Sequence, residues 1–232
     1  MSFYIMKRIV VAIDGFSSCG KSTMAKALAK YAGYTYVDTG AMYRAVALYA
    51  IDHNLIDTEN IKETELKQAL SNIKISFTTV DGVQHTVLNG VDVESRIRTL
   101  EVANGASRVS AIGFVRRALV ALQQEMGKEG GVVMDGRDIA TVVFPDAELK
   151  VFVTATAEVR AQRRYDELKA KGEEQPYADV LANVQERDYR DTHRAESPLR
   201  QADDARLLDN SNMTREEQFE ILKSWFNSTI TE

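Results

Sequence analysis

A chain of 232 residues with 44% hydrophobic and 27% charged residues is typical of a globular protein with one sizeable core, or of one core that carries small inserted lobes. Its net charge of −5 argues against nucleic acid as the main partner, because such binders usually carry a basic excess. The single cysteine, Cys19, excludes an intrachain disulfide framework and a multi-cysteine metal site. No apolar run approaches the roughly 18 residues that cross a bilayer, and the first residues lack the pattern of a signal peptide, so we expect a cytoplasmic protein without a membrane partner.

The predicted elements alternate between strands and helices. Ile9–Ile13 is rich in β-branched residues and too short for a helix, so it predicts a buried strand. Further strands are expected at 34–37, 131–134, 149–154 and 206–208, and helices at 23–31, 42–51, 114–128 and 216–225. This alternation predicts an α/β fold with a central parallel sheet flanked by helices.

One region breaks the alternation. Short strand-like runs lie at 73–77, 84–88 and 91–93. They are separated by Asp81-Gly82 and Asn89-Gly90, which are dipeptides strongly favoured in hairpin turns. The pattern predicts a small antiparallel lobe, residues 60–98, inserted into the main fold.

A glycine-rich loop follows the first predicted strand and opens the first predicted helix. Residues 15–22 fit G-x-x-x-x-G-K-[ST], in which backbone N–H groups and a helix N-terminus form a concavity that binds phosphates. Lys21 would neutralise the β- and γ-phosphates of ATP, and the Ser22 hydroxyl would coordinate the accompanying Mg²⁺. The expected ATP-binding residues of this loop are Gly15, Phe16, Ser17, Ser18, Cys19, Gly20, Lys21, Ser22 and Thr23.

Two further motifs stand where predicted strands end. In Asp38 to Arg44, Thr39 suits a helix N-cap, so that Arg44 would emerge from the first turns of the helix. Asp135 to Asp138 follows a strand at the edge where ligands bind in open α/β sheets. Taken alone, the first motif is better explained as a capped helix with a solvated arginine, and the second is equally well explained as an ordinary turn.

Arginines gather in a third region. Arg160, Arg163 and Arg164 share one helical face, as do Arg187, Arg190 and Arg194, and a turn-like break at 171–176 separates the two sets. One such segment is usually a solvated face, but two sets beside a phosphate loop favour a helical hairpin with its arginines aimed one way. Such a lid, residues 158–195, would supply positive charge to phosphoryl transfer and exclude water. The remaining residues, 1–59, 99–157 and 196–232, would form the core.

The ordered set of motifs resembles bacterial-type cytidylate kinases, which are P-loop nucleoside monophosphate kinases. The motifs are the phosphate loop, D-[ST]-G-x-x-Y-R, E-V-A-N-x-A-S, D-G-R-D-x-x-T-V-x-F-P-D-A and E-R-D-x-R-D-x-x-R, and they run from Ile9 to about Asp209. The resemblance implies a P-loop kinase fold with an antiparallel insert and a helical lid. It implies transfer of the γ-phosphoryl group of ATP to CMP or dCMP, with Mg²⁺ as cofactor and the two nucleotides as partners. We expect a monomer.

The resemblance also implies roles for individual residues. Ser107, Arg116 and Asp138 would contact the cytosine ring, and a carboxylate and a hydroxyl can accept from its amino group while an arginine donates to its acceptors. The acceptor phosphate would be held by Arg44, Arg137 and Arg194, with Thr39 nearby, and the ribose would be reached by Arg187 and Asp191. The lid arginines over ATP would include Arg160 and Arg164, and the catalytic residues would be Lys21, Arg137, Arg187 and Arg194.

The chain departs from the family pattern within the phosphate loop. Many members have proline and small residues where this chain has Phe16 and Cys19, and Ser22 replaces the glycine that commonly follows the lysine. The Ser22 hydroxyl completes the general phosphate-loop motif. Within enzymes, a kinase for another acceptor such as UMP, AMP or shikimate is the alternative. A GTP-hydrolysing switch would need N-K-x-D and D-x-x-G motifs, which the sequence lacks.

Overall fold

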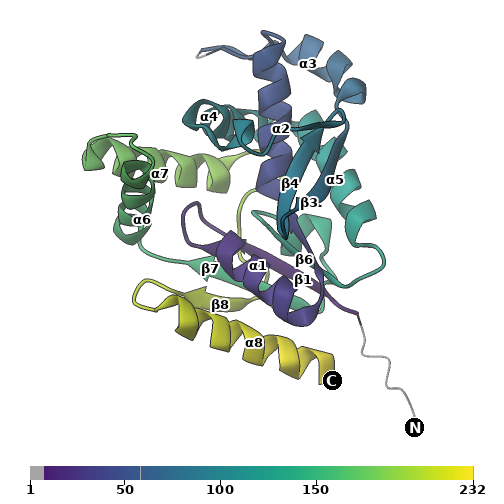
Figure 1. Ribbon diagram of the computed structural model, residues 1–232, viewed down its shortest axis with the longest axis vertical. Helices are drawn as coiled ribbons and strands as arrows, with labels where there is room; N and C mark the ends of the chain where they lie inside the picture. The colour runs from purple at the N-terminus through teal and green to yellow at the C-terminus, as the bar shows by residue number, and fades with distance from the viewer. Residues whose placement is uncertain (1–7, 58, 232) are drawn as a thin grey trace. The chain divides into compact units, whose positions relative to one another are not determined.

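The computed structural model describes residues 8–57 and 59–231 (Figure 1). The chain divides into two compact units. The first comprises Met1–Val37 and Gln124–Glu232, and the second comprises Asp38–Gln123. The predicted boundaries of a lobe at 60–98 and a lid at 158–195 stay predictions.

The first unit is built on a parallel sheet of five strands, as the alternating pattern predicted. In spatial order the strands are β2 (Thr35–Asp38), β6 (Val132–Gly136), β1 (Val10–Gly15), β7 (Leu149–Thr154) and β8 (Arg206–Asp209). β1 pairs in parallel with both β6 and β7, and β7 pairs in parallel with β8. The phosphate loop therefore leaves the middle strand of the sheet.

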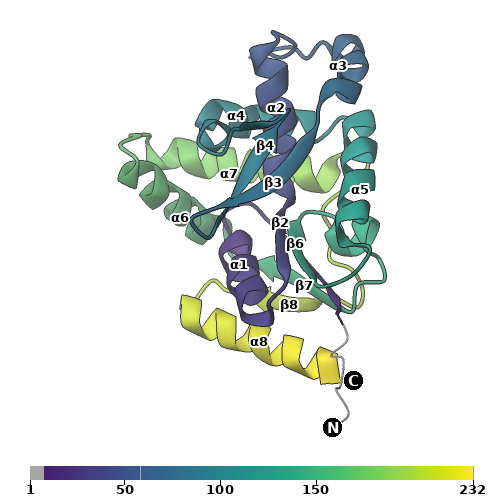
Figure 2. The same cartoon turned by 45° about the vertical axis from the view of Figure 1, so that its right-hand side comes forward.

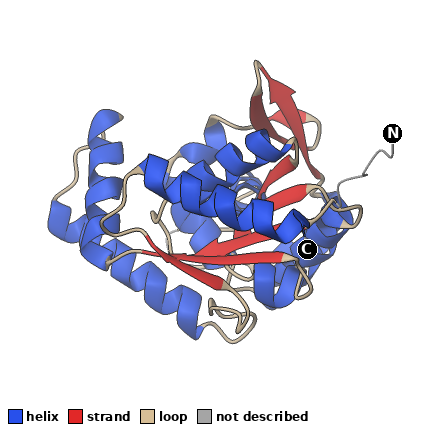
Figure 3. Cartoon of the chain, turned by 90° about the horizontal axis from the view of Figure 1, so that it is seen from below, coloured by secondary structure: helices blue, strands red, loops and turns tan. Residues whose placement is uncertain are grey.

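Two helices cover one face of this sheet. α1 (Lys21–Ala32) and α8 (Arg215–Thr231) lie side by side in Figures 1 and 2. Figure 3 shows α8 running alongside the strands up to the C-terminus. Val151 and Val153 point into the core beneath these helices, while Phe152 points to the opposite face and packs against Leu199, as the alternation of side chains along a strand requires.

Three helical segments of the first unit follow the central strands. A π-helical turn, Ile139–Val143, comes shortly after β6. α6 (Ala157–Ala170) and α7 (Tyr177–His193) form the predicted helical hairpin, seen in green in Figure 1. The hairpin has a small core of its own, formed by Ala161, Leu168, Val180 and Val184.

The second unit contains the antiparallel lobe that the sequence predicted. Its strands are β3 (Ile75–Val80), β4 (Val83–Leu88) and β5 (Val91–Asp92), paired in that order. Both two-residue turns, Asp81-Gly82 and Asn89-Gly90, have φ between 50° and 84° at each position. These left-handed values are those of type I′ hairpin turns, which explains why the dipeptides are diagnostic.

Helices make up the rest of the second unit. They are α2 (Thr39–Asp52), α3 (Glu63–Ala69), the 3₁₀ turns Leu70–Asn72 and Arg96–Arg98, α4 (Leu100–Val109) and α5 (Gly113–Gly127), whose last turn belongs to the first unit. Helix α4 was not among the helices expected from the sequence. A Cβ on Gly105 would lie 3.3 Å from the Cβ of Ala47 on α2, so this glycine allows the two helices to approach closely.

The expected cap of α2 was wrong by one residue. Asp38, not Thr39, is the N-cap, and its carboxylate accepts a hydrogen bond of 2.8 Å from the backbone N–H of Ala41. Thr39 is the first helical residue and is buried. Aspartate suits this position because its negative charge also faces the positive end of the helix dipole.

None of the helices within residues 8–57 and 59–231 combines the length and apolar character that a membrane crossing requires.

Candidate active site

The phosphate loop has the conformation of an anion-binding concavity. Gly15, Ser18 and Gly20 have φ of 146°, 57° and 89°, and α1 begins directly after Gly20. A Cβ on Gly15 would overlap the backbone of Val153 on β7, so only glycine fits there. A loop with alternating backbone handedness that runs into a helix N-terminus turns successive N–H groups toward one anion.

Side-chain donors from the loop itself and from other parts of the first unit hold the loop's carbonyl groups. The carbonyl of Phe16 accepts from Lys21 Nζ at 2.6 Å, and that of Ser17 accepts from Arg160 at 3.5 Å. The carbonyl of Cys19 accepts from Asn210 Nδ2 at 2.7 Å. Carbonyls held in this way stay out of the position that phosphate oxygens require.

Lys21 is buried, and a second positive charge acts on it. It is 5% exposed, and burial lowers its pKa below the ordinary value for lysine. The positive charge of Arg137 lowers that pKa further. Lys21 and Arg137 are both positively charged. They are therefore suited to stabilising the negative charge of the phosphates during phosphoryl transfer.

Ser22 shares a carboxylate that the sequence analysis left without a role. Ser22 Oγ donates to Asp135 Oδ2 at 2.8 Å, and the hydroxyl of Tyr36 donates to Asp135 Oδ1 at 2.7 Å. A hydroxyl beside a carboxylate at the end of a neighbouring strand is the pair that holds Mg²⁺ in P-loop enzymes, so these oxygens fit the cofactor. The sequence feature that could have identified Asp135 is its position at the start of the D-G-R-D motif, near the end of β6.

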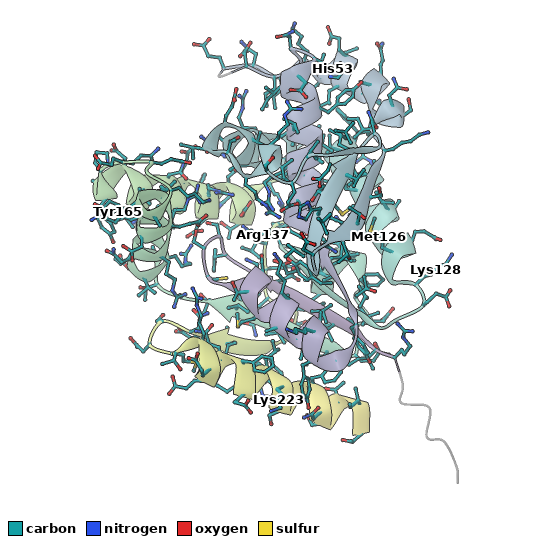
Figure 4. All side chains as sticks on the ribbon, viewed as in Figure 1. His53, Met126, Lys128, Arg137, Tyr165 and Lys223 are labelled. Atoms are coloured by element: carbon teal, nitrogen blue, oxygen red, sulfur yellow. The ribbon has the colours of Figure 1, made fainter. Side chains whose placement is uncertain are left out.

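Three of the predicted arginines gather around one buried carboxylate. Arg137 Nε donates to Asp191 Oδ2 at 2.8 Å, and Arg194 lies 3.8 Å from Asp191 Oδ1 (Figure 4 labels Arg137). Burial opposes the ionisation of Asp191, but Arg137, Arg194 and Arg187 outweigh it, and the pKa of Asp191 is lowered overall. Guanidinium groups gathered in this way are suited to binding a phosphate-bearing substrate.

Asp14 connects the phosphate-loop strand to the segment after Asp138. Its side chain is 1% exposed and accepts from the backbone N–H groups of Ile139 and Ala140 at 2.9 and 2.7 Å. Burial raises the pKa of Asp14 to about 7, and the charge of Asp138 works in the same direction. The bonds fix the π-helical turn that begins directly after Asp138, and so fix the position of this predicted base-contacting residue.

The lid arginines have different partners, and their shared aim toward one site stays a prediction. Arg160 is 4% exposed, pairs with Asp188 through both terminal nitrogens at 2.9 and 2.6 Å, and lies 4.9 Å from the ring centre of Phe16. Arg163 bonds Asn210, and Arg164 pairs with Glu167 on its own helix. The sequence spacing of these arginines places them on one helix surface, but each side chain bonds a different carboxylate or amide.

Arg194 also departs from the expected helical face. α7 ends at His193, and Arg194 follows it with φ −62° and ψ 145°, which is an extended conformation. Its Nε donates to the carbonyl of Ser197 at 2.7 Å. The extended backbone directs this side chain toward Asp191 rather than along the helix surface that Arg187 and Arg190 share.

In the second unit, Arg44 shares its carboxylate with an arginine that sequence reasoning missed. Arg44 and Arg98 both bond Asp38 Oδ2, at 3.0 and 3.1 Å. Burial opposes the charge of Asp38, but Arg44 and then Arg98 outweigh it and lower its pKa. Arg98 also bonds Glu94 at 2.7 Å. It carried no signal in the sequence, because it lies in a short polar stretch without helical spacing.

Ser107 and Arg116 lie on adjacent helices of the second unit and are joined through one residue. Arg116 on α5 is 1% exposed and donates to the carbonyl of Ser110 at 2.8 Å. Ser110 Oγ in turn donates to the carbonyl of Ser107 on α4 at 2.9 Å. Arg116 also lies 5.5 Å from the ring centre of Tyr43. A fully charged side chain held at such low exposure indicates a function beyond solubility.

A phosphate loop on the middle strand of a parallel sheet, a hydroxyl–carboxylate pair and a cluster of arginines together define a P-loop kinase of small phosphate-bearing substrates. The family model described as cytidylate kinase matches residues 11–227. A cytidylate kinase of Parabacteroides distasonis is 64% identical over 222 residues, which are 95% of each chain. One of Bacteroides thetaiotaomicron is 58% identical over 229 residues, which are 98% of this chain and 100% of the relative.

The chain belongs to the cytidylate kinase family, and it is a nucleoside monophosphate kinase, a transferase. The sequence-based recognition of this family is thereby confirmed. A solved structure of an uncharacterized protein from Eubacterium ventriosum has a TM-score of 0.52 and 12% identity, and the match covers 96% of this chain and 99% of that one. At this identity the likeness concerns the fold alone.

Proposed function

We propose that the protein transfers the γ-phosphoryl group of ATP to CMP, or to dCMP, and releases ADP with CDP or dCDP. One observation carries the proposal: Arg137 bonds Asp191 at 2.8 Å, Arg194 lies 3.8 Å from the same carboxylate, and Lys21 of the phosphate loop is buried in the same unit. Membership of the cytidylate kinase family supports the choice of acceptor.

On the ATP side, residues 15–23 would hold the phosphates through backbone N–H groups, with Lys21 on the β- and γ-phosphates. Ser22 would bind Mg²⁺, and Asp135 would join it, directly or through a water molecule. The metal would offset charge on the phosphates. Arg164 and Arg160 would contact ATP from the lid, although Arg160 must first release Asp188. Because the transition state is stabilised by charge rather than by covalent help, the contribution of each of these residues is electrostatic.

On the acceptor side, three arginines would hold the phosphate of CMP. They are Arg137, Arg194 and Arg44, with Thr39 nearby. Asp138, Ser107 and Arg116 would contact the cytosine, and Arg187 and Asp191 the ribose. Cytosine offers an amino donor where uracil offers a carbonyl acceptor, so Asp138 would accept from the former and repel the latter.

A panel of acceptors tests the proposal. Release of ADP from ATP and Mg²⁺ is measured with CMP, dCMP, UMP, AMP and GMP, with Lys21→Met as the control for contaminating kinases. CMP and dCMP are expected to react far faster than the other three. Equal or better turnover of UMP would refute the cytosine assignment and leave the kinase assignment intact. Action as a monomer in the cytoplasm stays a prediction.

A further inference from the structure

Asn210 is a fully buried amide at a junction of four elements of the first unit. It directly follows β8 and is 0% exposed. Its Nδ2 donates to the carbonyl of Cys19 at 2.7 Å and to Gln218 Oε1 on α8 at 2.9 Å. Its Oδ1 accepts from Arg163 on α6 at 2.9 Å, and its backbone N–H donates to Thr154 on β7 at 2.9 Å.

The orientation of this amide is fixed by its neighbours. Arg163 can only donate, so the oxygen of the Asn210 side chain must face it. Arg163 also donates to the backbone carbonyl of Asn210 at 2.9 Å and so holds both ends of the residue. The amide nitrogen is thereby directed at the phosphate loop and at Gln218, and a rotated amide would place donor against donor.

The bond to Cys19 controls one peptide group of the loop. In a trans peptide the C=O and the following N–H point in opposite directions, so holding the Cys19 carbonyl also directs the N–H of Gly20. Gly20 has φ 89° and lacks a side chain that could restrict its backbone, so the orientation of this peptide needs an external restraint. The next residue is Lys21, where α1 begins.

We infer that Asn210 is a positioning residue of the phosphate loop, which holds the Cys19–Gly20 peptide in the orientation that binds the phosphates of ATP. The inference rests on the proposed role of this loop as the ATP site. A purely structural amide would act through the packing of β8 and α8 instead. The two Nδ2 bonds separate these roles, because one reaches the loop and the other reaches only α8.

The test uses two variants of Asn210 and one matched control. Asn210→Ala and Asn210→Asp both remove the donor to Cys19, and only the second adds a charge, so an effect common to both belongs to the lost donor. Gln218→Met removes the other bond of the same amide and leaves the bond to Cys19 in place. Unfolding in urea measures the stability of all three variants.

Two readouts follow the loop. The first is the affinity for ATP, together with the KM for each substrate. Both Asn210 variants are expected to bind ATP about tenfold more weakly, with an unchanged KM for CMP. Gln218→Met is expected to stay within twofold of wild type in both quantities. The second is the alkylation rate of Cys19, which is the chain's single cysteine and is 0% exposed. That rate is expected to rise about tenfold or more in both Asn210 variants and not in Gln218→Met.

The cysteine readout requires no nucleotide, so it separates this inference from the proposed function. A wild-type protein that fails to bind ATP would refute the proposed function, whereas Cys19 would still report how the loop is held. Wild-type alkylation and wild-type ATP affinity in the Asn210 variants would overturn the inference. Equal effects of Gln218→Met and Asn210→Ala on both readouts would also overturn it, in favour of a purely structural amide.

Discussion

Replacing Asp14 with Asn is expected to change how the stability of the protein depends on pH. The Asp14 carboxyl has a pKa of about 7 in the folded protein, against the ordinary value of 3.8 expected in the unfolded chain. Between these values the folded protein keeps a proton that the unfolded chain releases, so the free energy of unfolding falls as pH rises through this window. Asparagine cannot ionise and removes this dependence.

The expected magnitude follows from the difference in pKa. Each pKa unit corresponds to about 1.36 kcal/mol, and the part of the window that lies between pH 5 and pH 8 therefore contributes about 2–3 kcal/mol. Over this range the free energy of unfolding of the wild type, minus that of Asp14→Asn, should fall by about this amount. The variant also loses one hydrogen bond to the backbone. This loss changes the difference in free energy of unfolding by the same amount at every pH.

Urea unfolding without nucleotide or metal, followed by tryptophan fluorescence, measures this difference. Trp225 is the only tryptophan of the chain and packs against the same core as α1, so its signal reports the unit that contains Asp14. Asp209→Asn is the control, since this exposed carboxyl has a lowered pKa and stays ionised throughout the range. A difference between wild type and Asp14→Asn that stays constant from pH 5 to pH 8 would refute the reasoning.

The other predictions concern catalysis and the loop. Lys21→Met should lower kcat by about a hundredfold or more in the ADP-release assay, and a rate near that of wild type would exclude the loop from the chemistry. Arg137→Ala should lower kcat/KM for CMP and UMP alike, whereas Asp138→Ala should shrink the CMP-to-UMP ratio by about tenfold to a hundredfold. An equal loss for both acceptors in Asp138→Ala would mean that it supports the turn instead. Gly15→Ala should lower the free energy of unfolding by about 4 kcal/mol or more, because a Cβ overlaps the backbone of β7, and a loss in urea unfolding below about 1 kcal/mol would contradict the clash.

The sequence predicted the fold well where local chemistry decides it. The hairpin turns follow from the tolerance of Asn, Asp and Gly for positive φ, and the strands follow from β-branched runs. The place of Gly105 in α4 could not be predicted from local propensity, because it depends on contact with Ala47, which is 58 positions away in the chain. The N-cap was misplaced by one residue because Asp38 and Thr39 are both good caps, and only the backbone geometry selects between them.

The sequence identified the motifs of the candidate site, but it did not predict which side chains pair with one another. Spacing placed Arg160 and Arg163 on one face, but their directions depend on Asp188 and Asn210, which come from distant parts of the sequence. Neither Asp14 nor Asn210 was assigned a role from a sequence motif. Their roles follow from the backbone groups to which they are hydrogen-bonded, and these are known only from the structure. These hydrogen-bonding roles can be assigned only from the folded structure, in which segments distant in the sequence lie next to each other.

The strand order has a consequence for how the protein is made. β1 lies between β6 and β7, whose first residues are Val132 and Leu149, and the loop that follows β1 is held by Asn210. At a synthesis rate of about 5–20 residues per second, Asn210 leaves the ribosome roughly 10–40 s after Lys21. β1 gains its neighbours only after β6 and β7 have been synthesised, and the apolar face of α1 lacks α8, which begins at Arg215, until after Asn210. The phosphate loop is thus synthesised well before the residue that holds it, and β1 stays unpaired on the nascent chain until β6 and β7 follow.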